Sequence, residues 1–157
     1  MAKKILLAVD NSKNSLKAVK YVANALNTDA AITMLSILPD PTAGCELDSP
    51  ALIPLFKENM KTFCSLEEAK KVAVDGFLDE AKQILVKAGF PSKNIAVKVR
   101  KKKTGIARDI LKEATRGKYD TIVIGRRGLT GIKQFLFGSV SNKVVQLAQN
   151  ASVIVVD

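Results

Sequence analysis

Short runs of apolar residues, each ending in polar or turn-forming residues, place the tightest limits on what this chain can fold into. The first run occupies residues 5–9 and ends at Asp10, Asn11 and Ser12. Consecutive apolar residues over so short a length are typical of a strand that is buried on both faces. The pattern along the chain predicts strands at residues 5–9, 31–38, 95–99, 121–124 and 152–156.

Helices are predicted between these strands, because apolar residues recur there at helical spacing. Ser12 or Asn14 suits the start of the first helix, Ser65 the start of the second, and Gly117 the end of the third. The predicted helices include residues 19–26, 66–88, 107–114 and 140–148. Residues 39–65 hold four of the five prolines, and we expect an excursion or lid there, with a short helix at 52–63.

Strands that alternate with helices in this way predict a single α/β domain over residues 1–157. Strands that are apolar on both faces need helices on both sides of a parallel sheet. We therefore expect a doubly wound, Rossmann-like or flavodoxin-like domain with a five-stranded parallel sheet of order 3-2-1-4-5. In such folds ligands bind beyond the carboxyl ends of the strands, where the winding reverses. Asp10 after the first strand and Gly125 after the fourth would then face one crevice.

The absence of histidine from all 157 residues excludes Ser-His-Asp and Cys-His catalysis and most catalytic zinc sites. Cys45 and Cys64 lack the paired spacing of a zinc or redox motif, and we expect free thiols. The apolar run that follows Lys3 and Lys4 is only five residues long, too short for a signal peptide core or a membrane span. We therefore expect a cytoplasmic protein without membrane association.

Glycines mark the place where the fourth strand passes into the fourth helix. We call Gly125, Gly128, Gly138 and Ser139 the glycine module, which reads Gly-x-x-Gly-x9-Gly-Ser. Glycine lets an anion approach the main chain, and a helix start offers unpaired N–H groups to phosphate oxygens. The spacing is neither a Walker P-loop nor the GxGxxG of dinucleotide folds. From these residues alone, phosphate binding and a merely structural turn are equally open.

Three charged residues at the same end of the predicted sheet have two interpretations each. Asp10 is a candidate for binding a ribose hydroxyl or, directly or through water, a metal ion near phosphates. Its spacing to Ser12 favours helix capping, and the two roles are compatible. Arg126 and Arg127 are candidates for neutralising phosphate charge, with a solvated loop as the equal alternative.

A basic run at residues 98–103 holds five cations in six positions, in a chain whose formal net charge is +10. Such a charge suits an anionic partner but does not identify one. The run has no interleaved aromatic residue, which favours a solvated strand end over a nucleic-acid site. Thr104 and Gly105, which follow the run, are candidates for a small anion-binding nest.

Over nearly its whole length the chain resembles the universal stress protein family. The resemblance lies in residues 4–12, 32–39, 121–141 and 151–156, and the complete glycine spacing is similar to that of the ATP-binding branch of the family. It implies that Asp10 lies on the ribose and metal side of a bound nucleotide. It implies phosphate contacts at Gly125, Gly128, Gly138, Ser139 and the backbone of Val140.

The resemblance also implies a base site and a partner. Ala8 and Ile37 occupy places that line the adenine and ribose region in ATP-binding relatives, and Ile37 would offer main-chain hydrogen bonds to the base. Relatives often form homodimers through the last strand, which agrees with the apolar edge at residues 153–156. The chain departs from the family at residues 101–105, where relatives often have a Gly/Pro turn.

The expected function is that of an ATP-binding stress-response protein, which binds ATP with Mg²⁺ or Mn²⁺ and signals by conformational change to an unknown protein partner. One alternative is a slow ATPase or phosphotransferase at the same site, for which Asp10 is the only evident base. The other alternative is a nucleotide-free interaction or nucleic-acid-binding module that uses the basic surface.

Overall fold

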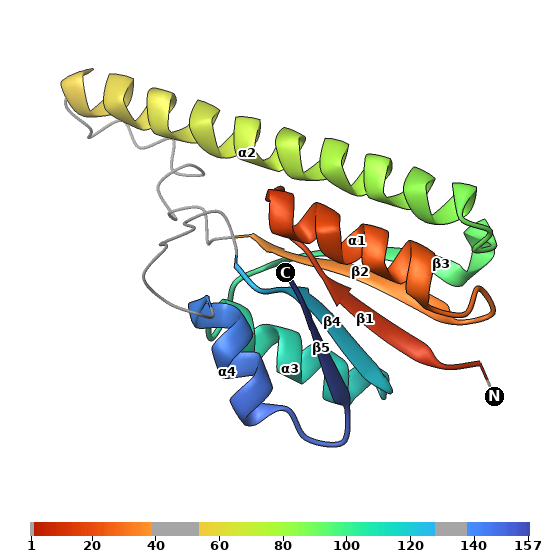
Figure 1. Ribbon diagram of the computed structural model, residues 1–157. Helices are drawn as coiled ribbons and strands as arrows, with labels where there is room; N and C mark the ends of the chain where they lie inside the picture. The colour runs from red at the N-terminus through yellow and green to blue at the C-terminus, as the bar shows by residue number, and fades with distance from the viewer. Residues whose placement is uncertain (1, 39–53, 128–137) are drawn as a thin grey trace.

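Helices cover both faces of a central sheet in this chain (Figure 1). The computed structural model describes residues 2–38, 54–127 and 138–157, without the side chains of residues 54–64 and 67. The strands are β1 (Lys4–Ala8), β2 (Ala31–Leu38), β3 (Ile95–Lys101), β4 (Thr121–Gly125) and β5 (Ser152–Val156). The helices are α1 (Lys13–Ala25), α2 (Pro54–Lys87), α3 (Ile106–Gly117) and α4 (Ser139–Leu147). The predicted α/β class is confirmed.

The sheet has five strands in the order β3-β2-β1-β4-β5, and every neighbouring pair is parallel. Ile5 of β1 lies opposite Ile32 of β2 on one side and Thr121 of β4 on the other. The chain winds outward from β1 to β3, then returns to the other side of β1 to form β4. The predicted strand order is therefore confirmed, and the winding reverses between β1 and β4.

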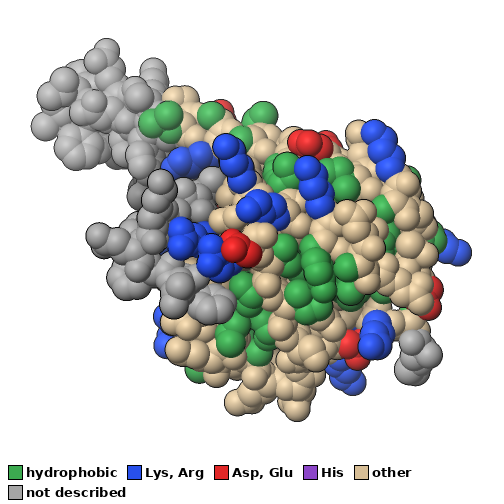
Figure 2. Space-filling view, in the orientation of Figure 1, with side chains coloured by type: hydrophobic (Ala, Val, Ile, Leu, Met, Phe, Trp, Pro, Cys, Tyr) green, Lys and Arg blue, Asp and Glu red, His purple; other side chains and the backbone are tan. Residues whose placement is uncertain are grey.

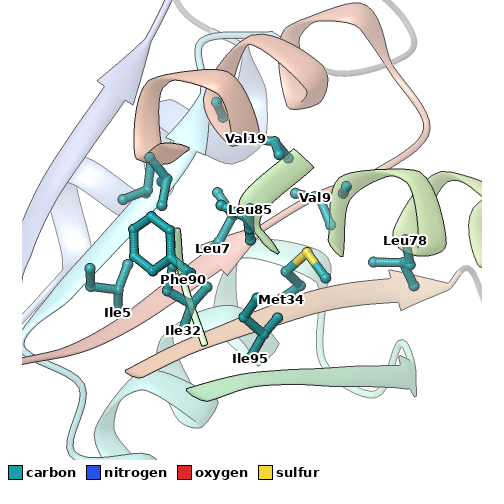
Figure 3. Packing of buried hydrophobic residues seen from close by; sticks show 14 of the residues in the cluster. Ile5, Leu7, Val9, Val19, Ile32, Met34, Leu78, Leu85, Phe90 and Ile95 are labelled. Carbon is teal, nitrogen blue, oxygen red and sulfur yellow. The ribbon is translucent and has the colours of Figure 1, made fainter. Parts of the chain in front are cut away.

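Alternate residues of the central strands point into two cores, one on each face of the sheet. Leu7 of β1 and Met34 of β2 lie in a cluster with Leu85 of α2, which Figure 3 shows at close range. Leu6 and Ile122 belong to the second cluster, which α3 and α4 cover. Each such side chain, when fully buried, contributes roughly 1.5–3 kcal/mol to folding. Burial on both faces is the reason that these strands are largely apolar, with Thr33 and Ser36 of β2 as buried polar exceptions.

Helix α2 is longer than the sequence pattern predicted. It runs without a break from Pro54 to Lys87, over 34 residues, so the predicted helix start at Ser65 and the separate short helix at 52–63 are wrong. Proline fits at the first position of a helix, where its missing N–H is not needed, and no proline follows inside α2. The interpretations of Cys45, of the Cys64 side chain and of the excursion at residues 39–53 lie outside the described part of the chain.

The end of α3 differs in detail from the prediction. Gly117 is the last helical residue, but the left-handed backbone conformation falls on Lys118, with φ of 51°. Gly117 is needed for space, because an added Cβ would clash with the ring of Tyr119. A short 3-10 helix over Ser92–Asn94, which was not predicted, leads into β3. Within the described residues, no helix is long and apolar enough to cross a membrane.

Candidate functional site

The carboxyl ends of β1 and β4 lie side by side, with Ala8 opposite Ile124. We call this place the switch point, because the winding of the sheet reverses there. Asp10 follows β1 and Gly125 ends β4, so both predicted site residues belong to this edge. In doubly wound folds the switch point is where ligands bind.

Asp10 is half-buried and fixes the start of α1. Its Oδ1 accepts hydrogen bonds from the N–H of Ser12 at 2.9 Å and from the hydroxyl of Ser15 at 2.8 Å. Ser12 is the N-cap, and its side chain accepts a hydrogen bond from the N–H of Ser15 at 3.1 Å. The capping interpretation is therefore confirmed. Oδ2 of Asp10 accepts no hydrogen bond from the described residues.

The main chain of Ile37 is open on the side of the switch point. Leu35 accepts a hydrogen bond from the N–H of Val9 at 2.9 Å, so the main-chain groups of Leu35 face β1. Alternate residues of a parallel strand face the same neighbour, so those of Ile37 face the same way. β1 has ended at Ala8, and no hydrogen bond from the described residues reaches Ile37 on this side. The main chain of Leu35 is thus paired with the β1 segment, whereas β1 has ended before it could pair with the main chain of Ile37.

Ala8, the last residue of β1, contributes differently. Its side chain is 4% exposed and belongs to the core beneath α3 and α4. Any contact of Ala8 with a ligand would therefore involve its backbone or the small exposed part of its side chain.

Gly125 is required by packing. A Cβ at this position would lie 2.9 Å from the backbone carbon and oxygen of Asn14, in the first turn of α1. Real Cβ contacts are almost never that short, so only glycine lets α1 approach the end of β4 this closely. Because Asp10 fixes the start of the same helix, this approach helps to hold Asp10 beside β4.

Gly138 is the N-cap of α4 and fastens this helix to β4. Its N–H donates a hydrogen bond to the carbonyl oxygen of Arg126 at 2.8 Å, so this donor is already used. The first hydrogen bond inside α4 runs from the N–H of Asn142 to the carbonyl of Gly138 at 3.0 Å. The N–H groups of residues 139–141 therefore have no acceptor among the described residues. Ser139, the first residue of α4, is exposed.

Ser141 is a residue of this edge that sequence reasoning missed. It is 2% exposed, and its hydroxyl lies 2.7 Å from the carbonyl oxygen of Arg126 and 3.1 Å from that of Gly138. This hydroxyl donates to the end of β4 and holds the start of α4 in place. A small polar residue on the buried side of a first helical turn was the available signal.

Arg126 is held in place beside the last strand. Its Nη2 lies 2.8 Å from Oδ1 of Asp157, and its N–H donates to the carbonyl of Val156 at 2.7 Å. Its Nε is buried and has no hydrogen-bond partner among the described residues. A freely solvated loop therefore does not describe Arg126. Arg127 is half-buried, and Gly128 lies outside the described residues.

The predicted anion nest at Thr104 and Gly105 is filled by the chain itself. The carboxylate of Asp109 accepts hydrogen bonds from the N–H of Lys103 at 2.7 Å and from the hydroxyl of Thr104 at 2.7 Å. Burial raises the pKa of Asp109, but the hydrogen bonds from Lys103, Thr104 and Gly105 outweigh it and lower the pKa from 3.8 to about 2. The nest is a cap for α3.

The described residues contain no group of three His, Cys, Asp or Glu side chains that could hold a metal ion. Oδ2 of Asp10 is the open carboxylate oxygen found at the switch point. A single carboxylate fits a hard cation that takes its other ligands from phosphates and water.

Fold and site together define the class of this protein. It is an α/β protein of the Rossmann-like class, in which the fourth strand leads to a helix start with open N–H donors at the switch point. The sequence model described as the universal stress protein family matches residues 1–157. The chain belongs to the universal stress protein family.

Two relatives illustrate the extent of the likeness. The chain is 30% identical over 150 residues to universal stress protein MJ0531 of Methanocaldococcus jannaschii, covering 93% of this chain and 77% of that protein. Its fold is similar to that of UspA from Lactobacillus plantarum, with a TM-score of 0.75 at 21% identity, covering 99% of this chain and 97% of that one.

Several solved structures with the same fold contain nucleotides. One is a universal stress protein in complex with cAMP (TM-score 0.66, 20% identity), which matches 99% of this chain and 97% of its own. Another is the Archaeoglobus fulgidus protein with dAMP (0.62, 18%), matching 100% and 98%. A third is an Arabidopsis thaliana protein with AMP (0.56, 17%), matching 98% and 90%. These likenesses show a shared fold.

Proposed function

We propose that this protein binds an adenine nucleotide at the switch point, with ATP as the principal ligand. The observation that carries the proposal is the set of open main-chain donors: the N–H groups at the start of α4 and the main chain of Ile37 all belong to the carboxyl-end edge of the sheet. A helix start suits phosphate oxygens, and a strand edge suits the hydrogen-bonding edge of a base. The family complexes with cAMP, dAMP and AMP support the same chemistry.

Each residue of the proposed site has one task. The phosphates would be bound by the N–H groups of Ser139 and Val140 and the hydroxyl of Ser139, and the ribose by Oδ2 of Asp10. The base would pair with the main chain of Ile37, beside Ala8. Gly125 and Gly138 serve by leaving space, since a Cβ at Gly138 would lie 3.1 Å from the carbonyl of Arg126. Arg126, Arg127 and Gly128 complete the proposed phosphate side.

Mg²⁺ or Mn²⁺ would accompany the triphosphate. Such an ion neutralises phosphate charge, and Oδ2 of Asp10 would contact it directly or through a water molecule. Oδ1 would stay committed to Ser12 and Ser15, so the start of α1 would not move.

Binding and conformational signalling, with turnover at most incidental, is the function that these groups support. Asp10 is the evident candidate for a base, and one of its oxygens already accepts two hydrogen bonds. A slow ATPase remains the alternative, and phosphate release by the wild type and Asp10→Asn separates the two. Asparagine keeps the Oδ1 acceptor and changes only the open oxygen, so a fast rate that Asn abolishes favours the enzyme.

The proposal also covers the oligomeric state of the protein and its location in the cell. Apolar side chains gather over β5 in Figure 2, and residues 153–156 of this edge strand are only partly buried. Pairing of two copies through β5 would cover this edge. We therefore propose a cytoplasmic homodimer that signals to a protein partner.

Ser139→Asp tests the phosphate site. Aspartate suits the first position of a helix, so the fold is retained, but its charge would lie against the phosphates at a cost on the order of 1–4 kcal/mol. We expect ATP affinity, measured by titration calorimetry, to fall by about tenfold or more. Asn27→Asp is the matched control. It adds the same charge at an exposed position just after the carboxyl end of α1, whereas the start of α1 lies at the switch point. Unchanged affinity in Ser139→Asp would refute the site.

A further inference from the structure

Much of the net positive charge of this protein belongs to edge strand β3 and to helix α3, which follows it. Residues 93–118, which span edge strand β3 and helix α3, contain ten Lys and Arg residues and two acidic residues. Their net charge is +8, in a chain of net charge +10. This edge is opposite β5, so it is separate from the proposed dimer edge.

Both acidic residues of this segment already have partners within it. Glu113 of α3 is buried, and its carboxylate lies 2.6 Å from Nζ of Lys98 and 3.4 Å from Nε of Arg100. The hydrogen bond to Glu113 raises the pKa of Lys98, which therefore stays charged. Asp109 caps the start of α3.

The lysines at positions 101–103 are exposed and form no ion pair with the described residues. Their charge faces solvent at the carboxyl end of β3. The edge therefore presents a field that attracts anions.

The outer side of β3 also presents free main-chain groups. The N–H of Lys102 donates to the carbonyl of Leu38 at 2.7 Å, which shows that Lys102 faces β2. Because alternate residues of a parallel strand face the same neighbour, the main-chain groups of Val97, Val99 and Lys101 face outward. β3 pairs with β2 alone among the described strands, so this side has no partner strand there.

The side chains of β3 divide by face. Val97 and Val99 are 43% and 37% exposed, although both are β-branched apolar residues. They alternate with Lys98 and Arg100, which turn to α3 and Glu113. One face of the edge thus carries the two exposed valines, followed by Lys101, and the other face carries Lys98 and Arg100.

We propose that the outer edge of β3 binds an extended acidic segment of a partner protein, which adds to the sheet as a further strand. The main chain of the segment pairs with Val97, Val99 and Lys101. Its apolar residues cover the two valines, and its carboxylates lie beside the exposed lysines. Added strands of this kind gain affinity from main-chain hydrogen bonds and specificity from alternate side chains.

Charge decides between the candidate partners. Two copies of this edge repel each other, so the lysines prevent self-pairing through β3 while leaving it complementary to an acidic strand. A nucleic acid would use the charge but not the valines or the free main-chain groups, and residues 93–118 contain no aromatic side chain on which a base could stack. An acidic strand uses all three features.

The test uses a fluorescent synthetic peptide as long as β3 in which valine and glutamate alternate, with anisotropy as the readout. Val99→Pro removes an outward N–H without removing a hydrogen bond to β2, and proline is tolerated at such edge positions. Val99→Thr is the matched control, because it keeps the N–H and the branched shape. We expect Val99→Pro to weaken binding about 3- to 10-fold more than Val99→Thr does.

A second peptide has the same composition, but its valines form one block and its glutamates another. It keeps the net charge and loses the alternation of valine with glutamate. We expect it to bind more weakly than the alternating peptide, and we expect exchange of lysines 101–103 for glutamine to reduce the salt dependence of binding. Circular dichroism and thermal melting check that each variant folds. If both peptides and a single-stranded RNA bind equally well and Val99→Pro has no effect, the proposal is wrong, and this edge is a general polyanion-binding surface. Absence of peptide binding at low salt would also overturn it.

Discussion

Gly125 shows how one residue can serve a site by leaving room. In the sequence it was a candidate for direct phosphate contact or for a simple turn. In the structure the backbone of Asn14 occupies the space that a Cβ on residue 125 would need. Glycine therefore lets α1 approach β4, and this approach helps to hold Asp10 at the switch point. Side-chain spacing could not predict this, because the contact joins two segments more than a hundred residues apart.

Gly125→Ala should destabilise the fold. The added methyl group would meet backbone atoms at 2.9 Å, and forced overpacking of this kind costs about 1–3 kcal/mol. Urea denaturation measures the change in the free energy of unfolding. Gly76→Ala, inside α2, is the matched control, because a Cβ there meets nothing within 4 Å. It should stabilise the protein by about 0.5–1 kcal/mol. An equal effect of both substitutions would contradict the packing account.

Helix α2 shows the limits of pattern reading at the scale of elements. Ser65 with acidic residues after it looks like a helix start, yet the helix continues through it. Capping signals are local, whereas a helix ends only where its hydrogen bonding is interrupted. The strands were predicted more closely, since β2 and β5 begin and end at the predicted residues. Their limits are set by burial on both faces, which the sequence records directly.

The start of α3 makes a prediction about pH. The pKa of Asp109 is lowered from 3.8 to about 2 in the folded state, so its carboxylate stabilises the fold above the unfolded pKa. This contribution is lost as the pH falls through 3.8 toward 2. The stability difference between wild type and Asp109→Asn, from urea melts at several pH values, should therefore shrink between about pH 6 and pH 2. A difference that stays constant over this range would mean that the cap does not depend on the charge.

At the scale of the whole molecule, the parallel sheet could be predicted because the strands are short, most of them are largely apolar, and a helix follows each of the first four. Asp10 and Gly125 were correctly expected at one edge for the same reason. Ser141 and the ion pair of Arg126 with Asp157 were not expected, because they depend on how the ends of β4, β5 and α4 meet. The alternation of strands and helices is visible in the sequence, whereas these contacts depend on packing.

The two edge strands of the sheet, β3 and β5, give the molecule two separate surfaces. β5 carries the partly buried apolar edge, β3 carries the basic edge, and the switch point lies between them. A nucleotide at the switch point would contact β1, β2 and the start of α4 at once. Its binding would thus be coupled to elements that lead to both edges, which is the physical basis for the proposed signalling role.

Amide NMR during titration with ATP and Mg²⁺ tests the central claim most directly. We expect the largest chemical-shift changes at Ile37, Ser139 and Val140, whose N–H groups have no acceptor among the described residues, while Val97 and Val99 stay unchanged. The absence of shifts at saturating nucleotide, or shifts confined to the β3 edge, would contradict it.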